Sequence, residues 1–477
     1  MARRRIPPFE TEITHLGPKG LGVGRAPDGA EVRVRGSVPG ARVHVVPAGK
    51  RKGIWTGRKT VTVRPPADGV QPRCAVFGMC GGCLLQEASL EAQRRDKHAM
   101  ALADVAAHVA LDGVVVHPIR GVDGAYGYRN RIEMSFGPRR WLTEGDQQAG
   151  VSQHGRFLGM HPPGRFDRVV DSLRCELVSE GMNELLQAVR SVALDDDAPP
   201  PNDVRSHEGF WRHVRLREGH HTQERLVVLF TRSPDPQTPW GPDAESWVER
   251  VAHAVADKAV GVVWCVEDGV ADVARGEVRR VWGRATLSEA LHPEGLRSAR
   301  FQLSHNSFFQ TNTPGAEVLY STIGEALGAH RDGRLLDLYC GTGSIGITLA
   351  DRFDEVIGIE EVEAAVRDAE ANAEANGVVA RYRCAKVEAA LDDLGPGAHV
   401  VVDPPRAGLH PKVAKHLAKT RARSLVYVAC KPGSLGRDAA FLAEGGWRLE
   451  ALWTVDLFPH TGHVEMVGRF VRDEETP

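Results

Sequence analysis

Hydrophobic residues follow a period of two near the start of the chain. The segments AEVRVRG (30–36) and ARVHVV (41–46) alternate apolar with polar or charged residues, and Gly, Pro and Asp turns lie around them. This alternation is expected of half-buried strands, because successive side chains of a strand point to opposite faces. Short strands so close together predict a small β-barrel over residues 1–64, and the oligonucleotide-binding (OB-like) barrel is one type with this pattern.

Continuous apolar runs replace this alternation in the C-terminal part of the chain, residues 301–477. The runs are RLLDL (334–338), EVIGIE (355–360), AHVVVD (398–403) and SLVYVAC (424–430). Strands that are buried on both faces have this composition, and a glycine loop and a helix follow the first run. The pattern predicts an α/β domain with a doubly wound, Rossmann-like parallel sheet.

The segment between these parts, residues 65–300, has the pattern of a mostly β domain with a few helices. Its clearest strand-like runs are YGYRNRIEMSFG, RLVVLFT and AVGVVWCVEDGV. In the first of them, alternation places Arg129 and Arg131 on the same side. We expect a central domain here, with part of residues 88–118 packed on the C-terminal domain.

Charge is distributed unevenly along the chain. The net charge is −2, but residues 1–64 hold fourteen Lys or Arg against four Asp or Glu, a net of +10 that leaves −12 for the rest. A basic head on an acidic body predicts a module that binds a polyanion. A solubilising tail and a purely structural barrel are the alternatives, and the strand pattern argues against the tail.

The chain shows neither a membrane-spanning nor a secretion pattern. No uninterrupted apolar run approaches the roughly 18 residues of a membrane helix, and no apolar segment follows the basic start MARRRIPPFE. The sequence therefore predicts a soluble, cytoplasmic protein without a membrane partner. In a reducing cytosol, its eight cysteines indicate metal binding or catalysis in preference to disulfides.

Three cysteines, Cys74, Cys80 and Cys83, cluster in CAVFGMCGGC with the spacing C-x5-C-x2-C. Zinc sites usually show two close pairs of ligands, whereas a 4Fe–4S cluster is held by four thiolates. Inert thiols are the third alternative. Either metal centre needs a fourth ligand from the remaining cysteines, which are Cys175, Cys265, Cys340, Cys384 and Cys430.

Cys175 is the best candidate for the fourth ligand. Cys265 lies in the apolar run VGVVWCV, which predicts a buried core thiol. Cys384 shows no special context, and Cys340 and Cys430 have other candidate roles. Cys175 precedes an amphipathic helix and has no competing role.

A glycine loop follows the first apolar run of the C-terminal part. Gly341, Gly343 and Gly346 form the pattern GxGxxG. The same pattern also occurs in turns whose glycines serve only packing. The next run ends in Glu360, nineteen residues after Gly341, and an acid at this place can bind ribose hydroxyls. A nucleoside-containing cofactor is therefore expected. Asp337 lies four residues before Gly341, and this D-x-x-x-G-x-G spacing resembles the first motif of class I S-adenosylmethionine methyltransferases.

Two further runs end in residues suited to chemistry. The third ends in Asp403, within DPPR, where those methyltransferases place a motif that faces the transfer site. The alternative interpretation, that the two prolines only end the strand, explains the prolines but not the rest of the motif. The fourth ends in Cys430, at the carboxyl edge of the predicted sheet, where ligands bind. The adjacent Lys431 could lower the pKa of this thiol. A buried structural cysteine is the alternative.

Near the C-terminus, the segment FPHTGHVE (458–465) holds His460, His463 and Glu465. Their spacing matches no common zinc motif. The other interpretation is a catalytic base, Glu465, in a loop that the histidines organise.

Together these motifs identify a family. Over essentially its whole length the chain resembles the RNA (uracil-5-)-methyltransferases, through a TRAM-like head and the motifs C-x5-C-G-G-C, SFFQTN, DLYCGTGSIG, DPPRAG, ACKPGSLGRD and FPHTGHVE. The head and the cysteine loop are most similar to the members that modify 23S rRNA. The resemblance implies a class I methyltransferase domain over 301–477, a TRAM domain over 1–64 and a central domain with the cluster loop over 65–300.

The resemblance also implies residue roles. Cys430 is the nucleophile, Glu465 the base, and Arg129 or Arg131 can bind RNA phosphates. The implied ligands of a 4Fe–4S cluster are Cys74, Cys80, Cys83 and Cys175. The implied S-adenosylmethionine pocket is Gln310, Tyr339, Gly341, Gly343, Ser344, Glu360, Lys386 and Asp403. The chain departs from its relatives at Ser344, Lys386 and Lys431, where other small or polar residues are usual.

The expected activity is methyl transfer from S-adenosylmethionine to C5 of a uridine in RNA, through a covalent bond between cysteine and C6, by a monomeric enzyme. The target that the resemblance implies first is 23S rRNA. The same chemistry on the tRNA T-loop is the second hypothesis. A catalytically silent RNA-binding or ribosome-assembly factor is the third, and the presence of Cys430 and Glu465 argues against it.

Overall fold

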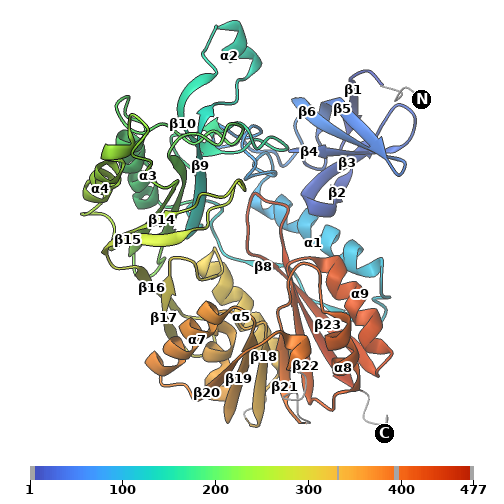
Figure 1. Ribbon diagram of the computed structural model, residues 1–477. Helices are drawn as coiled ribbons and strands as arrows, with labels where there is room; N and C mark the ends of the chain where they lie inside the picture. The colour runs from blue at the N-terminus through green and yellow to red at the C-terminus, as the bar shows by residue number, and fades with distance from the viewer. Residues whose placement is uncertain (1–5, 330–331, 391–396, 473–477) are drawn as a thin grey trace.

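The computed structural model describes residues 6–329, 332–390 and 397–472. Figure 1 shows an N-terminal sheet in blue and a central sheet in green, both above a C-terminal sheet in orange and red. None of the helices within these ranges is long and apolar enough to cross a membrane.

Six strands of the described residues form the N-terminal sheet, in the order β1-β5-β6-β4-β3-β2. Its elements are β1 (Phe9–Glu12), β2 (His15–Gly17), the 3-10 helix η1 (Pro18–Gly20), β3 (Leu21–Arg25), β4 (Glu31–Arg35), β5 (Arg42–Arg51) and β6 (Ile54–Arg64). The alternating segments of the sequence correspond to β4 and the first half of β5. Val32 and Val34 are fully buried, as the period of two predicted. Leu84 and Leu85, from beyond the strands, belong to the same core.

Seven strands of the described residues form the central sheet, in the order β11-β10-β9-β12-β13-β14-β15. They are β9 (Arg131–Arg139), β10 (His154–Met160), β11 (Val170–Asp171), β12 (Trp211–Glu218), β13 (Arg225–Thr231), β14 (Gly261–Val266) and β15 (Glu277–Gly283). The helical elements of this part are α2 (Glu144–Gln148), α3 (Glu180–Ala193), η2 (Gly241–Asp243) and α4 (Ala244–Ala254). Leu185 of α3 and Val248 of α4 share a core with Trp264 of the sheet. The mostly β prediction is confirmed. Arg129 precedes β9, which begins at Arg131, so the two arginines do not lie along one strand as alternation predicted.

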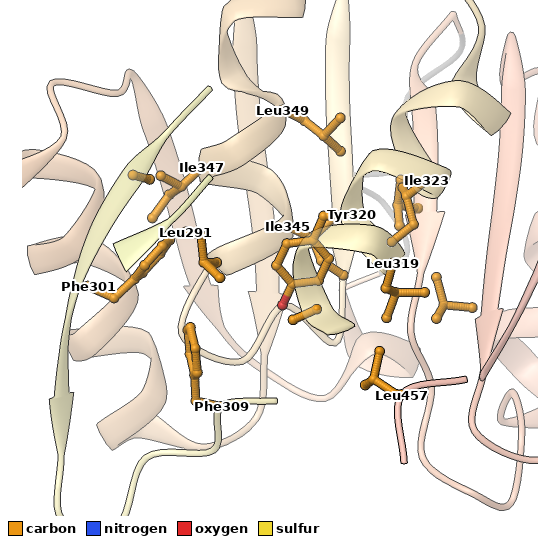
Figure 2. Packing of buried hydrophobic residues seen from close by; sticks show 14 of the residues in the cluster. Leu291, Phe301, Phe309, Leu319, Tyr320, Ile323, Ile345, Ile347, Leu349 and Leu457 are labelled. Atoms are coloured by element: carbon orange, nitrogen blue, oxygen red, sulfur yellow. The ribbon is translucent and has the colours of Figure 1, made fainter. Parts of the chain in front are cut away.

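A second core joins the central sheet to the C-terminal part. Phe230 and Cys265 of the central sheet pack with the hairpin of β16 (Thr286–Leu291) and β17 (Ala299–Ser304) and with α5 (Thr313–Leu327). Figure 2 shows this core, with Phe301 of the hairpin and Tyr320 of α5 among its members. Cys265 is fully buried, which confirms the prediction of a core thiol.

Nine strands of the described residues form the C-terminal sheet, in the order β20-β19-β18-β21-β22-β24-β23-β7, with β8 also paired to β23. They are β7 (Val115–Val116), β8 (Arg120–Gly121), β18 (Arg334–Leu338), β19 (Glu355–Glu360), β20 (Ala380–Cys384), β21 (His399–Val402), β22 (Ser424–Ala429), β23 (Trp447–Asp456) and β24 (Glu465–Arg472). Strands β18 to β22 run parallel, and β24 is antiparallel to its neighbours. The strand order reverses between β18 and β21, which makes the predicted switch point of a doubly wound sheet.

Helices pack on this sheet, and one of them comes from far earlier in the chain. The helical elements are α1 (Leu90–Ala106), α6 (Ser344–Leu349), η3 (Ala350–Arg352), α7 (Glu363–Ala375), η4 (Val387–Ala389), α8 (Pro411–Lys419) and α9 (Pro432–Ala443). Ala101 and Val105 of α1 are fully buried in the core of the C-terminal sheet. Figure 1 shows α1 between the N-terminal sheet and the C-terminal sheet, so this helix connects the two.

Candidate active site

The glycine loop bends tightly between β18 and α6. Gly341 and Gly343 have φ of +54° and +77°, and Tyr339 has φ of +66°. Such left-handed backbone is easy for glycine and uncommon for tyrosine. A Cβ built on Gly341 would meet nothing within 4 Å, so there is open space beside the loop. A Cβ on Gly346 would lie 2.8 Å from Val356, so the third glycine lets α6 approach β19 closely.

Two carboxylates lie at this loop. Glu360 Oε2 accepts a hydrogen bond from the Gly341 amide at 3.1 Å, and its other oxygen accepts one from the Val362 amide at 2.9 Å. Asp337 Oδ1 is buried and has no hydrogen-bond partner among the described residues. Burial, with Asp403 and Glu360 nearby, raises the pKa of Asp337 to about 7. These acceptors suit the hydroxyl and amino groups of a nucleoside cofactor, and the open space at Gly341 can admit it.

The other predicted cofactor residues lie around the same sheet edge or beyond it. Ser344 begins α6, and its hydroxyl is 2.7 Å from the Tyr320 hydroxyl. Asp403 directly follows β21, the neighbour of β18. Gln310 precedes α5, and Lys386 is an exposed residue after β20. The cofactor roles of these residues stay predictions.

Cys430 directly follows β22, at the same carboxyl edge, and is half-buried. Burial, with the Glu465 and Asp403 carboxyls nearby, raises the pKa of Cys430 to about 11. The idea that Lys431 would lower this pKa is wrong. Lys431 is exposed at the start of α9, and Arg406 is the cation that lowers the pKa, by its charge and a hydrogen bond, though less than burial raises it.

Glu465 is the first residue of β24, and only 4% of it is exposed. Burial and the nearby Asp403 raise its pKa well above the ordinary carboxyl value, while Arg406 and Lys97 act against this shift. A carboxyl with a raised pKa is a stronger base once it is ionised than an ordinary carboxylate. The role of Arg406 could have been sought in DPPR, because a cation four residues after a strand end can reach the same edge.

The loop before Glu465 is held by residues from far away in the sequence. The carbonyl of His460 accepts hydrogen bonds from the amides of Leu84 and Leu85, at 2.7 and 3.0 Å. Its amide donates to Gln93 Oε1 at 2.7 Å. Burial lowers the pKa of both His460 and His463 to about 4, so both rings are neutral at pH 7. The ring of His460 adds one contact, with Nδ1 3.1 Å from Gln93 Nε2. That the histidines organise the loop stays a prediction.

A buried ion pair anchors the beginning of the same loop. Lys97 of α1 and Asp456, the last residue of β23, are fully buried and bonded to each other. Lys97 Nζ also donates to the Phe458 carbonyl at 3.1 Å, and Arg94 Nε lies 3.7 Å from Asp456. No sequence pattern predicts this pair, because QRRDKHAM has the composition of an exposed helix surface.

The four cysteines of the predicted cluster come close enough to interact electrostatically. Burial, then repulsion from the other thiolates, raises the pKa of Cys80 to about 11 and of Cys83 to about 12. Cys74 and Cys175 are among the interacting thiols. Across the part of the chain that the structure describes, no group of three or more His, Cys, Asp or Glu side chains is arranged to hold a metal ion. The ligand set therefore stays a prediction.

Of the two predicted RNA-binding arginines, Arg129 lies close to the loop that leads to Glu465. It interacts electrostatically with both Cys175 and His463. Its Nε is buried, and the described residues offer this atom no hydrogen bond. Arg131 is already 3.7 Å from Glu133, and burial lowers its pKa.

Comparison with known proteins extends the similarity beyond this site. A family model described as tRNA (Uracil-5-)-methyltransferase matches residues 269–392 and 383–472. An uncharacterized RNA methyltransferase from Chlorobaculum tepidum is 34% identical over 477 residues, which cover 98% of this chain and 96% of that protein. A tRNA (uracil(54)-C(5))-methyltransferase from Pyrococcus horikoshii is 30% identical over 448 residues, 91% and 94% of the two chains.

A solved structure agrees with these matches. The Pyrococcus abyssi tRNA (uracil-54, C5)-methyltransferase, in complex with S-adenosyl-L-homocysteine, superimposes with a TM-score of 0.73 at 25% identity. The match covers 97% of this chain and all of that one. Similarity of this extent covers all three sheets as well as the C-terminal motifs. The chain therefore belongs to the RNA (uracil-5-)-methyltransferases, a family of S-adenosylmethionine-dependent enzymes.

Proposed function

We propose that this protein methylates C5 of a specific uridine in RNA, with Cys430 as the nucleophile and Glu465 as the base. The observation that carries the proposal is the meeting of a half-buried thiol with two carboxyls of raised pKa, Glu465 and Asp403, beside a glycine loop with open space. Perturbed groups gathered at a sheet edge are typical of catalytic sites.

Cys430 begins the reaction. Uracil C5 is a poor nucleophile, so the Cys430 thiolate first adds to C6, and the electrons of the C5–C6 double bond move toward O4 as an enolate. Arg406, which lowers the pKa of this thiol, favours the thiolate. S-adenosylmethionine supplies an electrophilic methyl group for C5.

Glu465 completes the reaction. After methylation, C5 still carries its proton, and the Glu465 carboxylate removes it. The electrons of that C–H bond restore the C5–C6 double bond, and the bond between C6 and the Cys430 sulfur breaks to release the thiolate. The residues proposed to hold the cofactor are those of the glycine loop with Glu360, Asp403, Tyr339, Gln310, Ser344 and Lys386.

We also propose that Cys74, Cys80, Cys83 and Cys175 hold a 4Fe–4S cluster. The support is the chemistry of the donor set, since the ligands of such clusters are thiolates. Burial and mutual repulsion make these four groups unfavourable as thiolates, and a cationic centre among them would remove that penalty. The proposed role is structural or RNA-contacting.

The proposed RNA target is 23S rRNA, which the TRAM-like head and the cysteine loop favour. The second candidate is tRNA, because relatives from both Pyrococcus species bear the name of a tRNA uracil-54 enzyme. The uridine must leave its stack in either RNA to reach the site. The basic residues 1–64 and Arg129 are suited to neighbouring phosphates.

The test is incubation with S-adenosylmethionine and unmodified 23S rRNA or tRNA, followed by mass spectrometry for 5-methyluridine. Product in one RNA alone identifies the target, and no product in either supports a silent RNA-binding factor. Cys430→Ala should give neither product nor RNA–protein adduct. Glu465→Gln should accumulate a methylated adduct, because its amide cannot take the C5 proton. Full turnover by Glu465→Gln would remove this residue as the base.

A further inference from the structure

The N-terminal sheet touches the loop that leads to Glu465. Gly20, at the end of η1, has φ of +71°, and a Cβ built on it would lie 2.3 Å from the Gly462 Cα. A Cβ on Gly462 would lie 2.3 Å from the Lys19 carbonyl oxygen and 2.6 Å from the Gly20 Cα. The two backbones therefore meet where neither position has room for a side chain.

This contact is one of several that hold the loop. Those described above come from the first hundred residues, and Tyr128 and Asn312 also donate side-chain hydrogen bonds to the loop backbone. Leu84 and Leu85 donate to the His460 carbonyl, and Lys97 donates to the Phe458 carbonyl. Leu84 and Leu85 also belong to the core of the N-terminal sheet. That sheet and its extension thus form one side of the loop's support.

We propose that Gly20 is a positioning residue for Glu465, so that the N-terminal sheet takes part in catalysis as well as in RNA binding. Glu465 is three residues beyond Gly462, and a displaced loop would displace its carboxylate. An error of 1 Å in the placement of a reacting group can cost on the order of 100-fold in rate. This inference rests on the proposed role of Glu465 as the base that acts after methyl transfer.

The test compares Gly20→Ala with Gly29→Ala. Gly29 lies in the turn between β3 and β4, with φ of +80° and nothing within 4 Å of a built Cβ, so it matches the backbone strain without the contact. At saturating RNA, Gly20→Ala should lower kcat by about tenfold or more and accumulate methylated RNA–protein adduct. The KM for S-adenosylmethionine should stay unchanged. The Gly29→Ala protein should behave like the wild type.

Gly462→Ala tests the contact from the other side. If the Gly20→Ala protein does not fold, Gly462→Ala takes its place in the test. The losses of the two single variants should not simply add in the double variant, because both disturb one contact. An unchanged kcat, or a weaker RNA affinity at normal kcat, would overturn the proposal and leave the sheet a binding module.

A readout that needs no activity separates this inference from the proposed function. Hydrogen exchange of the Leu84 and Leu85 amides, which donate to His460, should be faster in Gly20→Ala than in Gly29→Ala. Equal exchange in the two proteins would refute the positioning role even if methylation were absent. If exchange is faster in Gly20→Ala but the wild-type protein forms neither adduct nor product, only the proposed chemistry is refuted.

Discussion

The pKa of Cys430 leads to a prediction that can be tested without RNA. A thiol is protonated below its pKa, so a raised pKa leaves less of the nucleophilic thiolate at neutral pH. With a pKa of about 11, against an ordinary 9.0, the thiolate fraction at pH 8 is about one in a thousand rather than about one in ten. Each pH unit between 7 and 10 should therefore raise the reactivity of Cys430 about tenfold.

The assay is alkylation by iodoacetamide, followed by mass spectrometry of the peptide that contains Cys430. The exposed Cys384 in the same chain reports on the reagent itself. Arg406→Ala should slow the alkylation of Cys430 at every pH, because it removes the hydrogen bond and the charge that lower this pKa. Glu465→Gln should accelerate it above the pH at which Glu465 ionises, because it removes a carboxylate that raises the pKa.

Two results would refute this reasoning. One is a plateau in the Cys430 alkylation rate below pH 9, which would mean that the thiol ionises despite its burial. The other is faster alkylation in Arg406→Ala, which would mean that the arginine shields the thiol instead of favouring its ionisation. In the absence of both results, the methylation rate should also rise with pH, since the first step needs the thiolate.

Three further predictions follow from buried or clustered charges. Lys97→Met should destabilise the protein by about 3 kcal/mol in urea unfolding, because it leaves the Asp456 charge buried; adding Asp456→Asn should restore part of that stability, and a purely additive loss would contradict the pairing. Anaerobically purified protein should be brown with about four irons per chain. Cys175→Ser should lower this iron content and Cys384→Ser should not, whereas stoichiometric zinc would overturn the cluster. Arg129→Ala should weaken RNA binding and reduce the slope of log affinity against log salt by about one, whereas an unchanged slope would remove it as a phosphate contact.

The sequence by itself determined the elements whose pattern is local. A period of two predicted β4 and the start of β5, and continuous apolar runs predicted β18, β19, β21 and β22. These signals are reliable because burial on one face or on both faces of a strand selects residues along a short segment. The same runs end in Glu360, Asp403 and Cys430, so parallel strands alone place these three residues at one edge.

Only the tertiary structure decided how that edge is electrostatically tuned. Lys431 is the sequence neighbour of Cys430, yet Arg406, 24 positions earlier, supplies the cation that lowers the pKa of the thiol. The pKa of Cys430 is nevertheless raised, because burial outweighs this cation. A sequence pattern contains adjacency, whereas burial and through-space charge depend on which strands become neighbours in the sheet.

The support of the Glu465 loop also depends on contacts between distant segments. Lys97 has the sequence context of an exposed helix and is fully buried against Asp456, 359 positions away. Gly20 has the context of an ordinary turn and meets Gly462 backbone to backbone. Such contacts leave no periodic trace in either segment, because each involves one residue on each side. The sequence thus determined which residue types stand at the edge of the sheet, and the packing of distant segments against that edge, the first hundred residues among them, determined how these residues are held.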